Sequence, residues 1–290
     1  MSRTLAEGSA RRSKARRVAA SAVGLLSLLA LTGCSQGTVA QLKRLGLPEP
    51  ASDRSPYMSQ LWIGSWIAAG LIGVLVWGLI IWVMIRYRRR DDSAPTQVRY
   101  NLPIEMLYTV APVIIIAVLF FFTVEKQDKI NAPVAHPQHQ VVVTAQQWSW
   151  TFNYLHEPAA GGQNVYDLGT PARFPELWLV RGQSVRFDLH SPDVIHSFWV
   201  PAFYFKLDVI PGRENTFDMT PTRLGIFEGH CAELCGLYHS RMLFEVHIVT
   251  PQAFAKHMRA LKAAGQIGVL MGGQGSQTVA GLASSAGGAK

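Results

Sequence analysis

Residues 229–242 read GHCAELCGLYHSRM and place two thiols, an imidazole and a thioether in the order Cys-x3-Cys-x3-His-x2-Met. A second imidazole, His196, lies 35 residues before the first of these cysteines, at the start of an apolar run. Cysteine and methionine are soft metal ligands and imidazole suits copper, so this combination indicates a copper site that transfers electrons.

The second cysteine needs an explanation, because a blue-copper site with one copper ion uses a single cysteine. The thiolates of Cys231 and Cys235 could bridge two copper ions, each of them also bound by one histidine. The weak axial ligands would then be Met242 on one copper and a main-chain carbonyl, that of Glu233, on the other. Such a centre shares one electron between two metals, so its geometry changes little on reduction.

The same residues allow two other interpretations. Cys231 and Cys235 could form a disulfide outside the cytoplasm, where disulfides persist. A structural Cys2His2 zinc site could use His196 and His239, although it would leave Met242 without a role.

Residues 133–250 are predicted to form an all-β domain. Short runs rich in β-branched and aromatic residues alternate with proline and glycine and have no amphipathic helix between them, which is typical of an antiparallel sandwich or barrel. The candidate strands are Val141–Tyr154, Leu177–Val180, Ser184–Leu189, His196–Val200, Asn215–Met219 and Leu243–Val249. Leu155–Pro175, rich in glycine, alanine and proline, is predicted to be a long loop.

The C-terminal part is predicted to be a short helix followed by a tail. Thr250-Pro251 offers an N-cap and a proline at the first helical position, which predicts a helix over residues 251–264. Its apolar face would consist of Phe254, Met258 and Leu261. Residues 265–290 are rich in glycine, alanine and serine and are predicted to be disordered.

Two uncharged apolar runs precede the β domain. Residues 61–85 contain 25 residues without a charge, which at about 1.5 Å per residue can cross a hydrocarbon core of about 30 Å. Residues 106–124 form the second run. The loop between them, residues 86–105, begins with a cluster of arginines, which places it in the cytoplasm. The prediction is a transmembrane hairpin with the β domain outside the cytoplasm.

The N-terminus is similar to a bacterial lipoprotein signal. Five basic residues between positions 11 and 17 precede an apolar run over residues 18–31, as in a secretory signal peptide. The sequence LTGC at residues 31–34 resembles a lipobox, in which the cysteine becomes a lipidated N-terminus. We therefore expect a signal peptide at residues 1–33, lipidation of Cys34, an extracytoplasmic segment at residues 34–60, and a location in the bacterial cell membrane.

The charge of the chain is unevenly distributed. The formal net charge is +8, but residues 133–250 carry 7 basic and 11 acidic side chains. The excess of positive charge lies toward the two ends of the chain. Because the predicted folded domain is acidic, the sequence excludes nucleic acid as a partner.

The chain resembles subunit II of haem–copper cytochrome c oxidase over residues 56–262. The segments that carry the resemblance are Asn101-x3-Glu105-x3-Thr109-x2-Pro112, Gln147-Trp148-x-Trp150, Asp193-Val-Ile-His196-Ser197-Phe198, Pro211-Gly212-Arg213-x-Asn215 and the cysteine loop. The resemblance implies a two-helix transmembrane hairpin followed by a cupredoxin-like β-sandwich or barrel with a binuclear copper (CuA) centre. It also implies that electrons from cytochrome c enter the oxidase here and pass to haem in subunit I. Oxygen would be reduced to water there, coupled to proton translocation.

The resemblance assigns the ligands and partners as well. Copper would be bound by the side chains of His196, Cys231, Cys235, His239 and Met242 and by the carbonyl of Glu233. The carboxylate of Glu233 would also reach a magnesium ion at the boundary with subunit I. The implied partners are the other oxidase subunits, membrane lipid, and either cytochrome c or a cytochrome c domain of a neighbouring bc-type complex.

Three further positions match functional positions of the family. Trp148 matches the tryptophan at which electrons enter, although it begins an alternating aromatic series over residues 148–154 that could simply form a core face. Glu105 matches a glutamate at the mouth of a proton path, and the other interpretation is that it stabilises a helix N-terminus. Asp193 matches an acidic position near the docking surface for cytochrome c.

The departures from the family pattern remove no ligand: Tyr108 stands where tryptophan is usual, and His230 stands where glutamine is common. A quinol oxidase subunit II would lack the copper ligands, and a nitrous oxide reductase domain would lack the helix hairpin. A membrane-anchored copper chaperone or thiol-redox protein for oxidase assembly is the alternative function. That class would need one anchor and a βαβ domain with early cysteines, whereas two spans precede the late cysteines of this chain.

Overall fold

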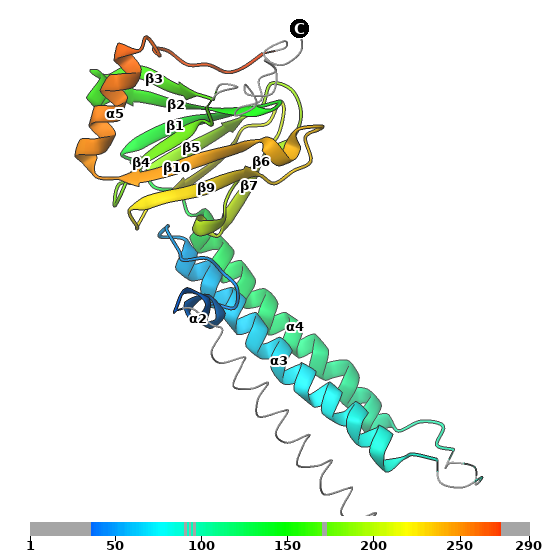
Figure 1. The fold of residues 1–290 in the computed structure, drawn as a ribbon. Coiled ribbons are helices and arrows are strands. Elements are labelled where there is room, and N and C mark those ends of the chain that lie inside the picture. The colour runs from blue at the N-terminus through cyan, green and yellow to red at the C-terminus, as the bar shows by residue number, and fades with distance from the viewer. Residues whose placement is uncertain (1–35, 90–91, 93, 95–96, 170–172, 274–290) are drawn as a thin grey trace, which may run out of the picture. The chain divides into compact units, whose positions relative to one another are not determined.

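The computed structural model describes residues 36–89, 92, 94, 97–169 and 173–273 (Figure 1). Residues 1–48 and residues 49–290 form two separate units. The described part of the first unit contains helix α2 (Gln36–Lys43). The predicted signal peptide and Cys34 lie outside the described residues, so their assignment stays a prediction.

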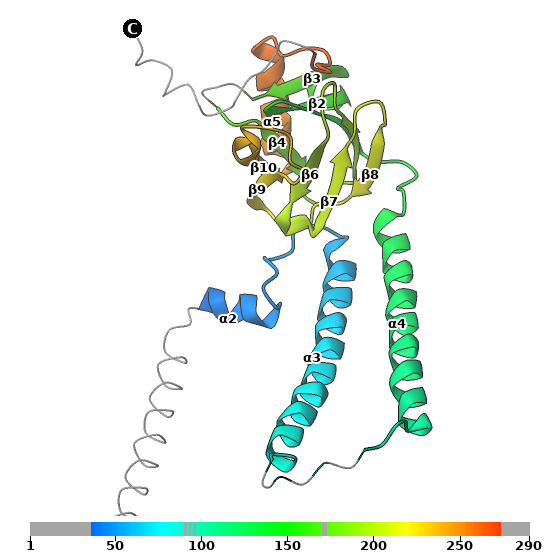
Figure 2. The same cartoon turned by 90° about the vertical axis from the view of Figure 1, so that its right-hand side faces the viewer.

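Two long apolar helices, α3 (Ser55–Arg86) and α4 (Leu102–Asn131), run side by side in the second unit (Figure 2). Both are long and apolar enough to cross a membrane. They contain the predicted spans 61–85 and 106–124 and extend beyond them at both ends. Asn101 caps the start of α4 by accepting a hydrogen bond from the Ile104 amide at 3.4 Å, as helix N-termini require.

The ten strands that follow α4 form a sandwich of two five-stranded sheets, with orders β3-β2-β1-β5-β8 and β4-β10-β9-β6-β7. The strands are β1 (His139–Gln146), β2 (Ser149–Glu157), β3 (Gln163–Leu168), β4 (Glu176–Val180), β5 (Val185–His190), β6 (His196–Val200), β7 (Phe205–Val209), β8 (Asn215–Met219), β9 (Gly225–Cys231) and β10 (Leu243–Val249). The predicted fold class, a helix hairpin followed by a β-sandwich, is confirmed. The sheets are mixed rather than antiparallel, because β1 pairs with β5 and β10 with β4 in parallel.

Two sequence predictions about strands were wrong. The single run predicted over Val141–Tyr154 is a hairpin, because β1 and β2 pair antiparallel on either side of residues 147–148. The predicted loop Leu155–Pro175 contains the end of β2, a short 3₁₀ helix η1 (Pro158–Ala160) and strand β3. Its glycines Gly161 and Gly162, with φ of 76° each, make the turn before β3. The residues of β3 then alternate toward the core, as Val165 and Asp167 are buried.

An aromatic cluster fills the space between the sheets. The Trp150 and Phe244 rings lie 5.2 Å apart, and the Phe198 and Phe244 rings lie 5.1 Å apart. All three side chains are 2% exposed or less, and each such burial stabilises the fold by about 1.5–3 kcal/mol. Phe198 and Phe244 each lie two residues after a predicted metal ligand, so this core fixes the strands that carry the predicted site.

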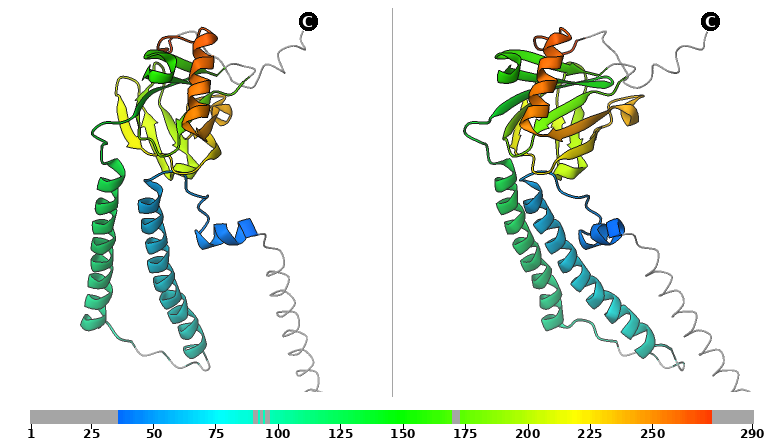
Figure 3. Two further views of the ribbon diagram at one scale, coloured as in Figure 1. Left: turned by 90° about the vertical axis from the view of Figure 1, so that its left-hand side faces the viewer. Right: turned by 60° about the vertical axis from the view of Figure 1, so that its left-hand side comes forward.

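Helix α5 (Pro251–Ala263) packs along the β3 and β4 side of the sandwich (Figure 3). The Thr250 hydroxyl caps it by accepting from the Ala253 amide at 3.4 Å, and the predicted face of Phe254, Met258 and Leu261 is buried. The prediction of a disordered tail from residue 265 was wrong for residues 265–273. The Leu270 amide donates to the buried Asn153 side chain of β2 at 2.7 Å, and the Leu270 carbonyl accepts from the Thr144 hydroxyl of β1 at 2.9 Å, so backbone groups of this segment satisfy buried polar groups of both strands.

An ion pair ties the end of α4 to the sandwich. Arg186 and Asp218 face each other across β5 and β8, with Nη2 2.7 Å from Oδ2. The Val134 amide donates to the Asp218 carboxylate at 2.6 Å, and Arg186 donates to the Val134 carbonyl at 2.9 Å. Both the amide and the carbonyl of Val134, in the segment that follows α4, are therefore hydrogen-bonded to this ion pair.

The Asp218 carboxyl makes the stability of the sandwich depend on pH. Burial alone raises its pKa, but hydrogen bonds from Arg186 and the Val134 amide outweigh burial, so the pKa lies below its ordinary value. The ionised carboxylate thus stabilises the fold above the unfolded-state pKa of about 3.9. This contribution is lost as the pH falls through the lowered folded-state pKa.

We expect Asp218→Asn to lower the free energy of unfolding by about 1–3 kcal/mol at pH 7 and to lose less stability than the wild type on acidification below about pH 4. Thermal unfolding followed by circular dichroism over this pH range measures both effects. Asp188→Asn is the matched control, because Asp188 lies on the neighbouring strand β5 and is hydrogen-bonded by the neutral side chains of Gln140 and Thr216. An acid profile of Asp218→Asn that parallels the wild type would contradict this assignment.

Candidate metal centre

Three neighbouring strands bring the predicted ligands to one end of the second sheet. Strand β9 lies between β6 and β10 and is antiparallel to both, so its end at Cys231 lies beside the start of β6 and the start of β10. His196 begins β6. Residues 232–242 connect β9 to β10 through a short 3₁₀ helix, η3 (His239–Arg241). Strand pairing therefore places residue 196 beside the cysteine loop.

The Cys231 sulfur forms one half of the cluster. It lies 3.9 Å from the His196 Nδ1 atom and 3.2 Å from the Glu233 carbonyl oxygen. Both His196 and Cys231 are buried. A histidine nitrogen, a thiol and a main-chain carbonyl thus converge at this half of the cluster.

The Cys235 sulfur forms the other half. It lies 3.6 Å from the His239 Nδ1 atom and 3.8 Å from the Met242 sulfur. The two cysteine sulfurs are 3.9 Å apart and both are free thiols, whereas a disulfide would hold them about 2.05 Å apart. Because the Met242 thioether belongs to the cluster, the donor set is softer than that of a Cys2His2 zinc site and suits copper.

Backbone hydrogen bonds hold the loop that carries these groups. The Cys231 amide donates to the Met242 carbonyl at 3.2 Å, and the Ala232 amide donates to the Ser197 carbonyl at 3.0 Å. The core residue Trp150 also donates from its indole nitrogen to the Met242 carbonyl at 3.3 Å. The ligand loop is thus anchored to β6, to its own far end and to the first sheet.

Asp193 orients the His196 ring, a role that sequence reasoning missed. Its Oδ1 atom lies 3.0 Å from the His196 Nε2 atom, which leaves Nδ1 directed toward Cys231. Metal-binding histidines commonly donate their second ring nitrogen to a carboxylate in this way. The Asp-x2-His spacing of residues 193–196 is the sequence signal that could have indicated the contact.

Local hydrogen bonds shift the pKa values of these groups. The hydrogen bond with Cys235 lowers the pKa of Cys231 to about 3, and the same contact raises the pKa of Cys235. The pair therefore readily gives up one proton, which leaves a thiolate, the form that binds metals. Burial alone raises the pKa of Asp193, but hydrogen bonds from the Gln147 amide, His196 and the Val194 amide outweigh it and lower the pKa.

Trp148 lies against the ligand loop rather than inside the core. Trp150, Phe152 and Tyr154 are fully buried, whereas Trp148 is half-buried. Its ring makes an edge contact with Tyr238 at a centroid distance of 5.0 Å. The alternating aromatic series thus forms a core face only from residue 150 onward.

Two other predicted side chains, the carboxylates of Glu105 and Glu233, are not part of this cluster. Glu105 lies in the first turn of α4, at the end away from the sandwich, and accepts a hydrogen bond from the Asn101 amide at 2.8 Å. The Glu233 side chain is exposed while its carbonyl faces the cluster. Leu234 and Leu237 on the same loop are 78% and 80% exposed, which gives the loop an apolar outer surface.

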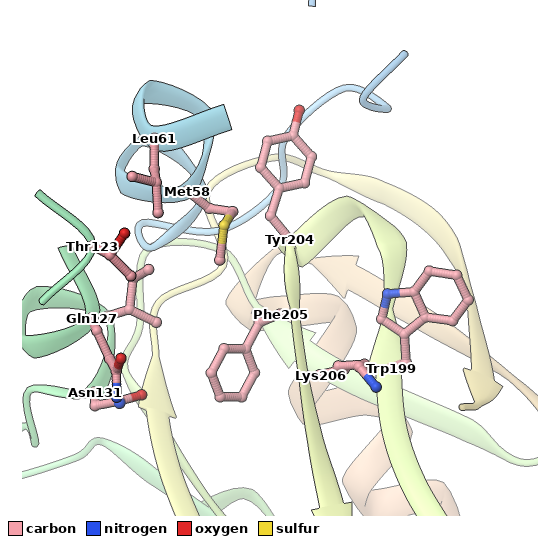
Figure 4. Close-up of a pocket in the computed structure, with 10 residues that line it drawn as sticks. Met58, Leu61, Thr123, Gln127, Asn131, Trp199, Tyr204, Phe205 and Lys206 are labelled. Carbon is pink, nitrogen blue, oxygen red and sulfur yellow. The ribbon is translucent and has the colours of Figure 1, made fainter. Parts of the chain in front are cut away.

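A cavity of about 340 Å³ lies elsewhere, where α3, α4, β6 and β7 meet (Figure 4). Met58 and Leu61 of α3, Gln127 of α4 and Phe205 and Lys206 of β7 line it. None of the predicted ligands lines it, so the thiol cluster, and not this cavity, is the candidate functional site.

Comparisons with known proteins agree over most of the chain. The family model described as cytochrome c oxidase subunit II, transmembrane domain, matches residues 40–125, and the one described as its periplasmic domain matches residues 176–249. The probable cytochrome c oxidase subunit 2 of Streptomyces avermitilis is 42% identical over 94% of this chain and 95% of that protein. Cytochrome c oxidase subunit 2 of Mycobacterium bovis is 35% identical over 81% of this chain and 79% of its own length. Among solved structures, the periplasmic domain of subunit II of cytochrome oxidase of Bradyrhizobium japonicum is similar, with 29% identity, a TM-score of 0.40, and coverage of 46% of this chain and 99% of that one.

We expect Asp193→Asn to weaken copper binding by about 10–100-fold, because His196 loses the carboxylate that orients it. Titration of the purified chain with copper, against a competing chelator, measures the affinity. Asp188→Asn serves as the control, since that carboxylate accepts hydrogen bonds from Gln140 on β1 and Thr216 on β8. Wild-type affinity in Asp193→Asn would show that the contact does not support the metal centre.

Proposed function

The chain belongs to the cytochrome c oxidase subunit II family, whose periplasmic domain binds copper, and on that premise we propose that electrons enter the oxidase through it. In this proposal it accepts electrons from cytochrome c at a binuclear CuA centre and passes them to haem in subunit I. Oxygen is then reduced to water in subunit I, with translocation of protons.

The convergence of the ligands at one end of β6, β9 and β10 is the observation that carries the proposal. The copper ions would be held by the residues His196, Cys231, Glu233 (through its carbonyl), Cys235, His239 and Met242. When bound, the copper pair supplies a site that takes up and releases one electron at a time.

The chain's own residues prepare this site in two ways. The thiol pair supplies a thiolate, because the hydrogen bond between the sulfurs lowers the pKa of Cys231. The loop is held at both ends by backbone bonds from Cys231 and Ala232. Because the ligands already lie close together, little structural rearrangement is needed when the charge of the centre changes.

The outer surface of the ligand loop is suited to a cytochrome c. Leu234 and Leu237 present exposed apolar side chains on the same loop as Tyr238, whose ring contacts Trp148, and the domain around them carries more acidic than basic residues. We propose that electrons enter at Trp148 and that Asp193 contributes to docking in addition to holding His196. Acidic groups at such a surface act mainly on the association rate of a basic partner.

The remaining assignments concern the oxidase complex. The exposed Glu233 carboxylate would bind magnesium at the boundary with subunit I, and Glu105 would mark a proton path although it also caps α4. The lipid-anchored Cys34 and the helix hairpin would hold the chain in the bacterial cell membrane. A cytochrome c domain of a neighbouring bc-type complex is the alternative donor.

A thiol-redox or copper-chaperone function is the second candidate, favoured by the free, buried thiol pair. Purified full-length chain, reconstituted with copper in detergent, separates the two functions. Two copper ions per chain with one unpaired electron shared over both nuclei in electron paramagnetic resonance are expected. One copper ion, or none with a Cys231–Cys235 disulfide, would favour the second candidate.

Met242→Leu should leave two copper ions bound and raise the reduction potential of the centre, because a weak electron-donating axial ligand is lost. A redox titration followed by optical absorption measures the potential. Met219→Leu is the control, because Met219 is also a buried methionine but lies on β8. Loss of all copper in Met242→Leu would contradict a weak axial role.

Trp148→Phe should slow the reduction of the oxidase by cytochrome c while the copper spectrum stays intact, because phenylalanine keeps the packing against Tyr238 but is a poorer electron relay. Stopped-flow reduction at limiting cytochrome c measures this rate. Trp178→Phe, which alters a tryptophan stacked on His257 at the other side of the domain, should reduce at the wild-type rate. Equal rates for Trp148→Phe and wild type would make Trp148 a packing residue.

A further inference from the structure

We propose that Gln147 is a positioning residue for the metal centre. It joins the β1–β2 turn, which also carries Trp148, to the segment that contains Cys235 and to the segment that contains Asp193 and His196. The inference rests on the proposed function and names a residue that acts through Cys235 and Asp193. Gln147 lies in the turn between β1 and β2, in the first sheet, whereas the ligands lie on the second sheet.

The Gln147 side chain holds the half of the cluster around Cys235. Its Nε2 atom donates to the Cys235 carbonyl at 2.7 Å. This short bond fixes the peptide plane that follows Cys235, and with it the direction of the side chain whose sulfur lies 3.6 Å from His239 and 3.8 Å from Met242. Rotation of that peptide would move the Cys235 sulfur relative to both neighbours.

The Gln147 main chain holds the other half. Its amide donates to the Asp193 Oδ2 atom at 2.7 Å, while the Asp193 Oδ1 atom contacts His196 Nε2 at 3.0 Å. A substitution at residue 147 keeps this amide and removes only the side-chain bond. The two halves of the cluster can therefore be perturbed separately.

Gly236 permits the close approach of the two segments. Its φ of 125° is a conformation that side chains rarely adopt. A Cβ atom on Gly236 would lie 3.1 Å from the Gln147 Nε2 atom and 3.2 Å from the Trp148 ring. The side-chain amide of Gln147 and the Trp148 ring thus contact two successive residues of the ligand loop, Cys235 and Gly236.

The consequence is an asymmetric effect on the copper centre. Loss of the side-chain donor frees the peptide after Cys235, next to His239 and Met242, while Asp193 still orients His196. Because Trp148 packs on the adjacent Gly236, the contact between Trp148 and the loop loosens as well. Electron input and the spectrum should therefore change together, without loss of copper.

Gln147→Met in the purified oxidase complex tests this, since methionine has a similar length and no donor. We expect two copper ions per chain, an altered copper hyperfine pattern in electron paramagnetic resonance, and reduction by cytochrome c slowed about 2–10-fold, the effect of one lost hydrogen bond. The Michaelis constant for cytochrome c should stay within twofold, because the docking surface is retained. A purely structural role of Gln147 would change stability but not the hyperfine pattern.

Gln140→Met is the matched control, because Gln140 lies on β1 and donates its side-chain amide to Asp188 at 2.7 Å, at the other end of the strand. Gln147→Asn decides the question if the methionine variant fails to assemble, since its shortened amide cannot reach Cys235. A wild-type hyperfine pattern and rate in either assembled variant overturn the proposal. If the wild-type complex itself lacks the shared two-copper signal, the proposed function fails instead.

Discussion

The antiparallel pairing of β9 with both β6 and β10 is the constraint on which the rest of the site depends. It brings His196, 35 residues away in sequence from Cys231, to the end of the strand that carries that cysteine. The same pairing closes residues 232–242 into a short connection whose ends are bonded to each other. Because Phe198 and Phe244 continue these strands into the aromatic core, packing in that core keeps the proposed ligands together.

A second layer of polar contacts converts this arrangement into a defined geometry. Asp193 selects the nitrogen with which His196 faces Cys231, and the turn at residue 147 links Asp193 with the Cys235 carbonyl. A network of buried polar groups in which every hydrogen bond is made fixes the orientation of its side chains, because any other arrangement would leave a donor or an acceptor without a partner. None of the proposed ligands lies on the first sheet, yet its β1–β2 turn is hydrogen-bonded to the loop that carries Cys235.

The membrane hairpin and the sandwich are joined by polar contacts of the same kind. Arg186 and Asp218 bind the main chain of Val134 just after α4, and Arg54 before α3 donates to the carbonyls of Lys129 and Ala132. The start of α3 is thus hydrogen-bonded to the end of α4, and Val134, which follows α4, is hydrogen-bonded to the first sheet. Such a junction limits the positions that the domain can take above the membrane surface.

Local patterns in the sequence were sufficient for the helix hairpin, the C-terminal helix and the choice of the thiol, imidazole and thioether groups proposed as ligands, since each depends on neighbouring residues. The ordered motifs also identified the family. The hairpin hidden in residues 141–154, strand β3 and the docking of residues 265–273 were decided by the tertiary structure, because partners distant in sequence satisfy their backbone groups. The same holds for Asp193 and Gln147, whose roles arise where two sheets meet. A side chain's own neighbours reveal its chemistry, but only the folded chain determines which group it faces.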